Sequence, residues 1–361
     1  MRFGRRHWAA SAAACAVLLA FGWWYLRGGG DGFLAVATAP QAVPSRSDTA
    51  TGKLAEEMFW RTLHEGRYED IPATIEVLTK AFKEHPYDPA IARRLGFLHG
   101  WKLVERNRMQ TITSTIADEA VLSQYYYDAA YRLDPTDDRM IGLKAVLRML
   151  NGQLNDDQKA IREGYFMGHE ANRRFPQFNY FAISVPLATL PYTDPRFKEA
   201  VEMQWQLLDS CDSWTDLKLN LSREEYAKRF PGPKRVCWDN WIAPHNIKGT
   251  LLHMGDILVK DGDWKKGVEI YQRIKAIQDY ENWPLKDFLE ERIRDAQANV
   301  ENFRVDYTKR LTEHVTRPAM LIDTGYVCVS CHQEKGSVPA LPNFPAPLAA
   351  GASKQRDTGG S

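Results

Sequence analysis

The chain contains 361 residues, of which 44% are hydrophobic, with 47 Lys and Arg against 46 Asp and Glu and only five cysteines. That length and apolar content suffice for one large or two ordinary domains, and five cysteines exclude a small disulfide-built scaffold. The first thirty residues hold four arginines and no acid, so the remainder carries 43 basic against 46 acidic residues. A slightly acidic body argues against nucleic acid as a partner.

The N-terminal segment has the pattern of a membrane anchor. Basic residues in 1–7 precede nineteen uncharged residues, Trp8–Leu26. About 20 apolar residues span a bilayer as a helix, and arginines before such a run favour a cytoplasmic N-terminus. We therefore predict a signal anchor at residues 1–27 that crosses a bacterial inner membrane once, with the rest of the chain in the periplasm. A flexible linker rich in Gly, Ala, Pro, Ser and Thr is expected at residues 28–53.

Two alternatives remain open for the first segment. Ala35-Val36-Ala37 has the small-x-small pattern of a signal-peptidase site. Cleavage there would leave a secreted or periplasmic protein, although the site lies about nine residues beyond the apolar run. The other alternative is a buried helix of a cytosolic protein.

The main body, residues 54–315, has apolar residues at helical spacing and no convincing strand pattern, which predicts an all-α domain. An Ala is followed five residues later by a Pro three times: Ala81 and Pro86, Ala130 and Pro135, and Ala171 and Pro176. Proline ends a helix, and a small residue before it lets a neighbouring helix approach closely. The body is therefore predicted to be a series of packed helix pairs.

The clearest pair lies at residues 249–279. Along it come a large residue, a glycine, a glycine-containing turn, a small residue and an aromatic residue, in the order found in the 34-residue tetratricopeptide repeat, which the segment resembles. Met254 replaces the usual Leu, Leu258 replaces the first aromatic residue, and the Ala–Pro endings are 49 and 41 residues apart. The resemblance implies an irregular α-solenoid whose concave surface binds a protein partner; a purely rigid platform is the alternative.

An insert at residues 209–245 interrupts the helical pattern with Pro and Gly and is flanked by Cys211 and Cys237. In an exported protein these two cysteines are expected to form a disulfide. Two free buried thiols are the alternative.

The strongest motif is Cys328-Val329-Ser330-Cys331-His332, the C-x-x-C-H arrangement of c-type haem attachment. Two thiols at this spacing add to the two vinyl groups on one edge of a porphyrin, and the adjoining His supplies its imidazole to the iron. We predict one haem c bound covalently by Cys328 and Cys331, with His332 as axial ligand. Haem attachment by this route occurs outside the cytoplasm, in agreement with the N-terminal segment.

Other uses of the motif are weaker. Zinc requires four ligands, and the motif supplies three with no second cluster nearby. A thioredoxin-type redox pair belongs at a helix start in a βαβ unit, for which there is no pattern here. A simple Cys328–Cys331 disulfide remains an alternative.

The residues after the motif, 333–342, resemble the proximal loop of class I c-type cytochromes, in which Gly, Pro and Leu recur at this spacing. The resemblance implies that the Pro339 carbonyl accepts the Nδ1 proton of His332. The resemblance does not extend further: a class I cytochrome takes its sixth ligand from a Met after the motif, and the 29 residues after His332 contain neither Met nor His. We predict a haem-binding segment at 316–342 and a disordered tail at 343–361.

The sixth ligand of the iron is therefore expected from upstream. Met320 is the tentative candidate and His314 a weaker one. A five-coordinate iron, or a ligand from another chain, is the alternative.

Two functions fit these features. The first is a membrane-anchored periplasmic monohaem cytochrome that transfers electrons and docks a redox partner protein through its repeats. The second is an adaptor or assembly scaffold in which the haem has a sensing or structural role. A peroxidase-type enzyme is a third, weaker possibility, since no distal acid–base pair can be identified.

Overall fold

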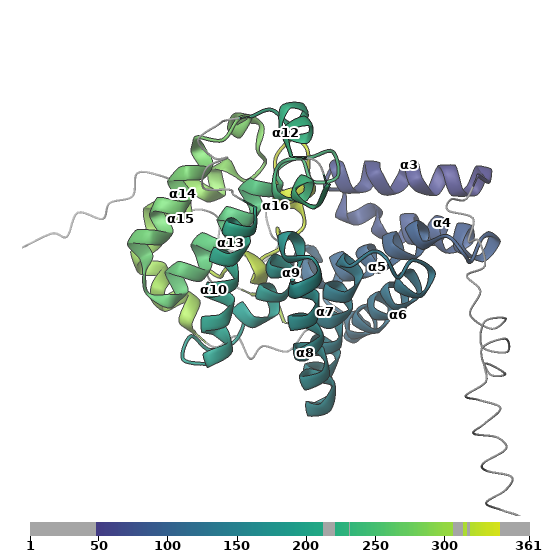
Figure 1. Cartoon of the computed structure of the whole chain (residues 1–361), viewed down its shortest axis with the longest axis horizontal. Coiled ribbons are helices and arrows are strands. Elements are labelled where there is room, and N and C mark those ends of the chain that lie inside the picture. Colours follow the sequence, from purple (N-terminus) through teal and green to yellow (C-terminus); the bar gives the residue numbers. More distant parts are fainter. Residues whose placement is uncertain (1–47, 212–220, 231, 306–312, 316–317, 340–361) are drawn as a thin grey trace, which may run out of the picture. The chain divides into compact units, whose positions relative to one another are not determined.

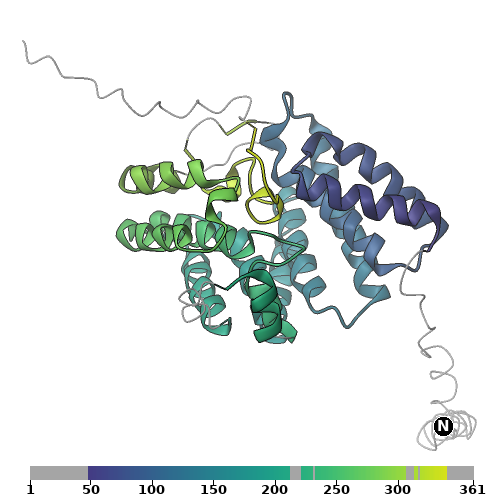
Figure 2. The same cartoon turned by 90° about the horizontal axis from the view of Figure 1, so that it is seen from above.

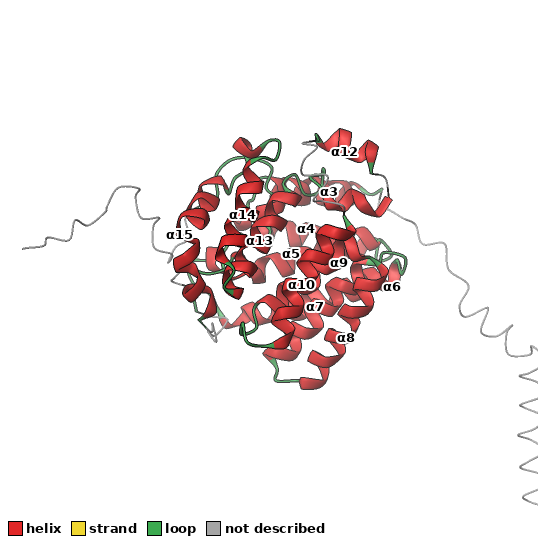
Figure 3. Ribbon diagram, turned by 60° about the vertical axis from the view of Figure 1, so that its left-hand side comes forward, coloured by secondary structure: helices red, strands yellow, loops and turns green. Residues whose placement is uncertain are grey.

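The computed structural model describes residues 48–211, 221–230, 232–305, 313–315 and 318–339, which belong to one compact unit (Figure 1). All regular structure in these ranges is helical and none is strand, which confirms the predicted all-α class (Figure 3). No helix among these residues is long and apolar enough to cross a membrane. The predicted anchor at 1–27, most of the linker and the tail at 343–361 lie outside the described residues.

The first half of this unit is a succession of helices, each packed against the next along the chain. Helix α3 begins at Ala50, four residues inside the predicted linker, because the Thr49 side chain caps it by accepting from the Gly52 amide. The helices are α3 (Ala50–His64), α4 (Ile71–Glu84), α5 (Pro89–Val104), α6 (Asp118–Leu133), α7 (Arg139–Leu154), α8 (Gln158–Arg174), α9 (Pro176–Ala188) and α10 (Pro195–Ser210), joined in part by 3₁₀ turns η1 (Tyr68–Asp70), η2 (Arg106–Arg108) and η3 (Ser114–Ala117).

The helix endings expected from the three Ala–Pro pairs are confirmed. Helices α4, α6 and α8 each end two residues before the proline. The residue between helix and proline has nearly the same conformation in all three, with φ −139°, −138° and −144° and ψ 77°, 84° and 75° at His85, Asp134 and Phe175. A following proline disfavours helical geometry at such a residue, so the chain must turn there.

The second half places one buried helix among its neighbours. Its elements are α12 (Arg223–Arg229), η4 (Gly232–Cys237), α13 (Asn246–Asp261), α14 (Trp264–Lys275), η5 (Tyr280–Asn282), α15 (Lys286–Arg304), η6 (Leu321–Asp323) and α16 (Val329–His332). Gly262 ends α13 at φ +108°, and the Asp263 side chain caps α14 by accepting from the Lys266 amide. The helix–turn–helix expected at residues 249–279 is therefore present.

Helix α13 is buried from Ile247 to Lys260 and packs against α10, α14, α15 and α16. The short helix α16, which carries the C-x-x-C-H motif, also contacts α3. Figure 2 shows this C-terminal segment in yellow between the purple and blue N-terminal helices and the green helices. The motif is thus embedded in the helical body rather than attached to its end.

Candidate haem-binding site

The three reactive side chains of the motif line one cavity of about 320 Å³. Cys328, Cys331 and His332 form part of its wall, and helices α5, α6, α7, α9 and α13 supply most of the rest. The wall is mostly apolar, with Phe97 and Phe181 among its aromatic residues. Small-molecule and cofactor sites are typically apolar cavities of about 300–1,000 Å³ with a few convergent polar groups. The fold therefore brings two thiols and one imidazole to a site of cofactor dimensions.

The imidazole of His332 is oriented by the Ile242 backbone. Its Nδ1 lies 2.9 Å from the Ile242 carbonyl oxygen, which can only accept, so the proton resides on Nδ1. Nε2 then carries the lone pair, and no described residue forms a hydrogen bond with it. Desolvation lowers the pKa of His332 to about 4, which keeps the ring neutral. A neutral imidazole with Nδ1–H bound to a carbonyl is the usual arrangement of a metal-ligating histidine.

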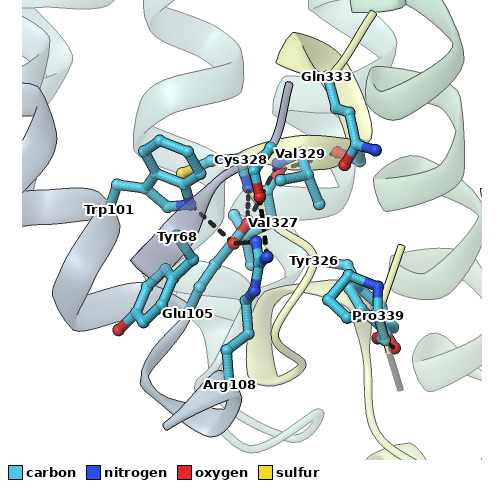
Figure 4. Close-up of polar contacts among 12 residues, drawn as sticks. Tyr68, Trp101, Glu105, Arg108, Tyr326, Val327, Cys328, Val329, Gln333 and Pro339 are labelled. Carbon is cyan, nitrogen blue, oxygen red and sulfur yellow. Dashed lines mark hydrogen bonds and ion pairs between the residues drawn. The ribbon is translucent and has the colours of Figure 1, made fainter. Parts of the chain in front are cut away.

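The predicted role of Pro339 is wrong. Its carbonyl accepts from the Tyr326 hydroxyl at 2.8 Å, and both residues are labelled in Figure 4. The Ile242 carbonyl takes its place at the imidazole of His332. The loop after His332 is fixed to helix α3, because the Glu334 amide donates to the His64 carbonyl at 2.8 Å. The acceptor for His332 is consequently ninety residues earlier in the chain rather than seven residues later.

The two cysteines of the motif are free thiols. Burial raises the pKa of Cys331 to about 12 and that of Cys328 well above its usual value. Redox-active C-x-x-C pairs use a thiolate of lowered pKa, which burial disfavours here. Among the described residues, no group of three His, Cys, Asp or Glu side chains is placed to hold a metal ion. The raised pKa values of both thiols therefore argue against the redox alternative.

The backbone of the motif is held by three separate parts of the fold. The carboxylate of Glu105, the residue after α5, accepts from the Cys328 amide at 2.6 Å and from the Val329 amide at 3.1 Å (Figure 4). The indole of Trp283 donates to the Ser330 carbonyl at 2.9 Å. The amide of His245, at the start of α13, donates to the Cys331 carbonyl at 3.0 Å. These contacts fix the position of the motif backbone from which both thiols project.

Helix α13 also shapes the site through a missing side chain. A Cβ at Gly249 would lie 2.3 Å from the Cys331 sulfur, so only glycine lets the motif approach α13 this closely. Neither Glu105, Ile242 nor Gly249 could be assigned to the site from the sequence. Glu105, for example, is 223 residues from Cys328, and only the packing of the helices brings them together.

The two expected sixth ligands are not at the cavity. Met320 is buried in the hydrophobic core and does not line it. Nε2 of His314 lies 2.7 Å from the Met109 carbonyl oxygen, and this residue does not line it either. Apart from Met1 and His7, every Met and His of the chain belongs to the described residues. Of these, His332 alone lines the cavity.

Cys211 and Cys237 form the predicted disulfide, and both line the cavity. The bond closes a loop with a sequence separation of 26 residues. In the chain-entropy model this contributes about 3.5 kcal/mol to stability. It therefore stabilises the part of the cavity wall to which Cys211, Val236 and Cys237 belong.

Replacing Cys211 and Cys237 together by Ser is expected to lower the free energy of unfolding by about 3 kcal/mol. Urea unfolding followed by circular dichroism measures this loss. Reduction of the wild-type protein with dithiothreitol is the matched experiment and should give a loss of similar size. An unchanged unfolding midpoint in both experiments would contradict a stabilising role for this bond.

Comparison of the chain with models of protein families, with curated proteins and with solved structures finds no match.

Proposed function

We propose that this protein is a monohaem c-type cytochrome and that its cavity holds a covalently attached haem c. The observation that carries the proposal is the convergence of both thiols and one correctly oriented imidazole on a single apolar cavity. Each thiol of Cys328 and Cys331 would add across a vinyl C=C bond of the haem: a C–S bond would form, the thiol hydrogen would move to the neighbouring carbon, and no electrons would be gained or lost. The protonated thiols have the composition that this addition requires.

The proposed activity is electron transfer. When bound, the haem supplies exchange of a single electron between its ferrous and ferric forms. His332 would bind the iron through Nε2 while the Ile242 carbonyl holds the ring and increases its basicity. The apolar wall would exclude water, which tunes the reduction potential.

The cellular setting of the proposal follows from the sequence. The basic and apolar N-terminal pattern favours a single-pass inner-membrane protein whose soluble part is periplasmic, or a secreted protein after cleavage. The tetratricopeptide-like pattern, with helices packed in chain order, supports an irregular solenoid that docks a redox partner protein.

The test is expression of the full chain in a bacterial strain that can attach haem c. We expect one haem per chain, retained in a denaturing gel and detected by haem staining, and a sharp reduced α-band in the visible spectrum. The same chain from a strain without the attachment system serves as the control and should be colourless. Colourless protein from the competent strain would rule out the proposal.

A second function, an adaptor with haem-based sensing, is favoured by one specific observation. Of the described Met and His residues, only His332 lines the cavity, so these residues offer no second strong-field ligand. This second function predicts that the reduced protein binds carbon monoxide, with a shift of its Soret band in a stopped-flow or static titration. A low-spin spectrum that carbon monoxide leaves unchanged would instead indicate a sixth ligand and favour simple electron transfer.

A further inference from the structure

The carboxylate of Glu105 is fully buried behind the haem-binding motif (Figure 4). Besides the Cys328 and Val329 amides, it accepts from the Trp101 indole at 2.7 Å and from the Arg108 guanidinium at 3.2 Å. Four donors from three parts of the chain therefore converge on one side chain. Burying a carboxylate away from water costs free energy unless its oxygens accept hydrogen bonds from the protein, as those of Glu105 do.

The donor pattern identifies the ionised form of Glu105. A protonated carboxyl group needs an acceptor for its own proton, whereas all four partners found among the described residues are N–H donors. Burial raises the pKa of Glu105, and Arg108, Trp101 and the two amides act against that rise. The negative charge of Glu105 is felt at the cavity wall, because it helps to raise the pKa of Cys328, which lines the cavity.

We propose that Glu105 is a positioning residue that holds the haem-binding segment by its amides and sets the reduction potential through its fixed charge. This inference rests on the proposed haem site. A buried anion stabilises the ferric form, which carries one more positive charge than the ferrous form, and so lowers the reduction potential. Arg108 offsets part of the charge but contacts the carboxylate at the longest of the four distances.

The test is the Glu105→Gln variant of the full-length holoprotein, measured by spectroscopic redox titration. Glutamine keeps the volume and can still accept from the two backbone amides, but it removes the charge. We expect the ferrous-to-ferric ratio at a fixed applied potential to rise at least tenfold, which is a positive shift of 59 mV for a one-electron couple. If the substitution instead loosened the site, water would enter, the ferric form would be favoured and the reduction potential would fall. The sign of the shift therefore distinguishes loss of the charge from loss of structure.

The control is Glu119→Gln. Glu119 is also buried and paired, with His99 at 2.6 Å and Lys102 at 2.5 Å, but it does not touch the motif. At the same applied potential, we expect the ferrous-to-ferric ratio of the Glu119→Gln variant to differ less than twofold from that of the wild type. An unchanged or lowered potential in Glu105→Gln, or an equal rise in the control, would overturn the inference.

A second measurement needs no variant. In the wild-type holoprotein, hydrogen exchange at the Cys328 and Val329 amides should be slowed at least a hundredfold relative to an unstructured peptide, because both bind a buried carboxylate. Unprotected exchange there would overturn the positioning role even if the variant failed to fold. Wild-type protein without haem would contradict the proposed function, whereas haem-loaded wild type with an unshifted variant would contradict this inference alone.

Discussion

Replacing Cys328 and Cys331 together by Ala is expected to reduce covalent haem to background while leaving the helical content unchanged. Without either thiol no thioether can form, whatever the shape of the cavity. The helices should persist, because α16 is only four residues long and is held through backbone contacts with Glu105, Trp283 and His245. Haem staining of denaturing gels measures the first effect, and far-ultraviolet circular dichroism measures the second.

The matched control is Cys15→Ala, which removes a cysteine from the predicted anchor and should leave one haem per chain. The single variant Cys328→Ala should retain haem through Cys331 alone, with a reduced α-band displaced to longer wavelength because one vinyl group stays conjugated with the porphyrin. Wild-type levels of covalent haem in the double variant would show that attachment does not use this motif. Loss of helicity would show that the body depends on the motif for folding.

Replacing Gly249 by Ala is expected to separate the motif from α13. The new Cβ would lie 2.3 Å from the Cys331 sulfur and 3.1 Å from the backbone carbonyl carbon of Ser330. Rotation of one side chain cannot relieve a contact that includes backbone. Overpacking of this kind costs about 1–3 kcal/mol or more, whereas the better helix propensity of Ala returns about 1 kcal/mol at most. We expect a net loss of about 1–2 kcal/mol in urea unfolding and a lower haem content per chain.

Gly168→Ala is the control for that substitution. Gly168 lies in α8, and its nearest neighbours are three side-chain carbons of the buried Ile183 at 3.0, 3.1 and 3.3 Å, with no backbone atom among them. A shift of a few tenths of an ångström relieves this contact, so stability should change by less than about 1 kcal/mol and haem content should not change. If Gly249→Ala behaves like this control, the described packing of α16 on α13 is incorrect.

The resemblance of residues 333–342 to class I cytochromes predicts Pro339 as the acceptor for His332, and the structure places Ile242 there instead. The Gln333 side chain packs against Gly66, where an added Cβ would lie 2.3 Å from the Gln333 side-chain oxygen. The Glu334 amide donates to the carbonyl of His64, the last residue of α3. The loop is committed to the helical body, so the local analogy could not hold.

The sequence by itself determined what depends on neighbouring residues. Helix ends follow from proline and its effect on the preceding residue, as at His85 and Asp134. The spacing of Cys328, Cys331 and His332 carries the haem hypothesis, because its chemistry needs only residues on one helical turn. The cavity, the Ile242 and Glu105 partners and the absence of Met320 from the wall were decided by tertiary structure. Those contacts join residues 90 to 223 positions apart, and the packing of whole helices, rather than any local pattern, brings such residues together.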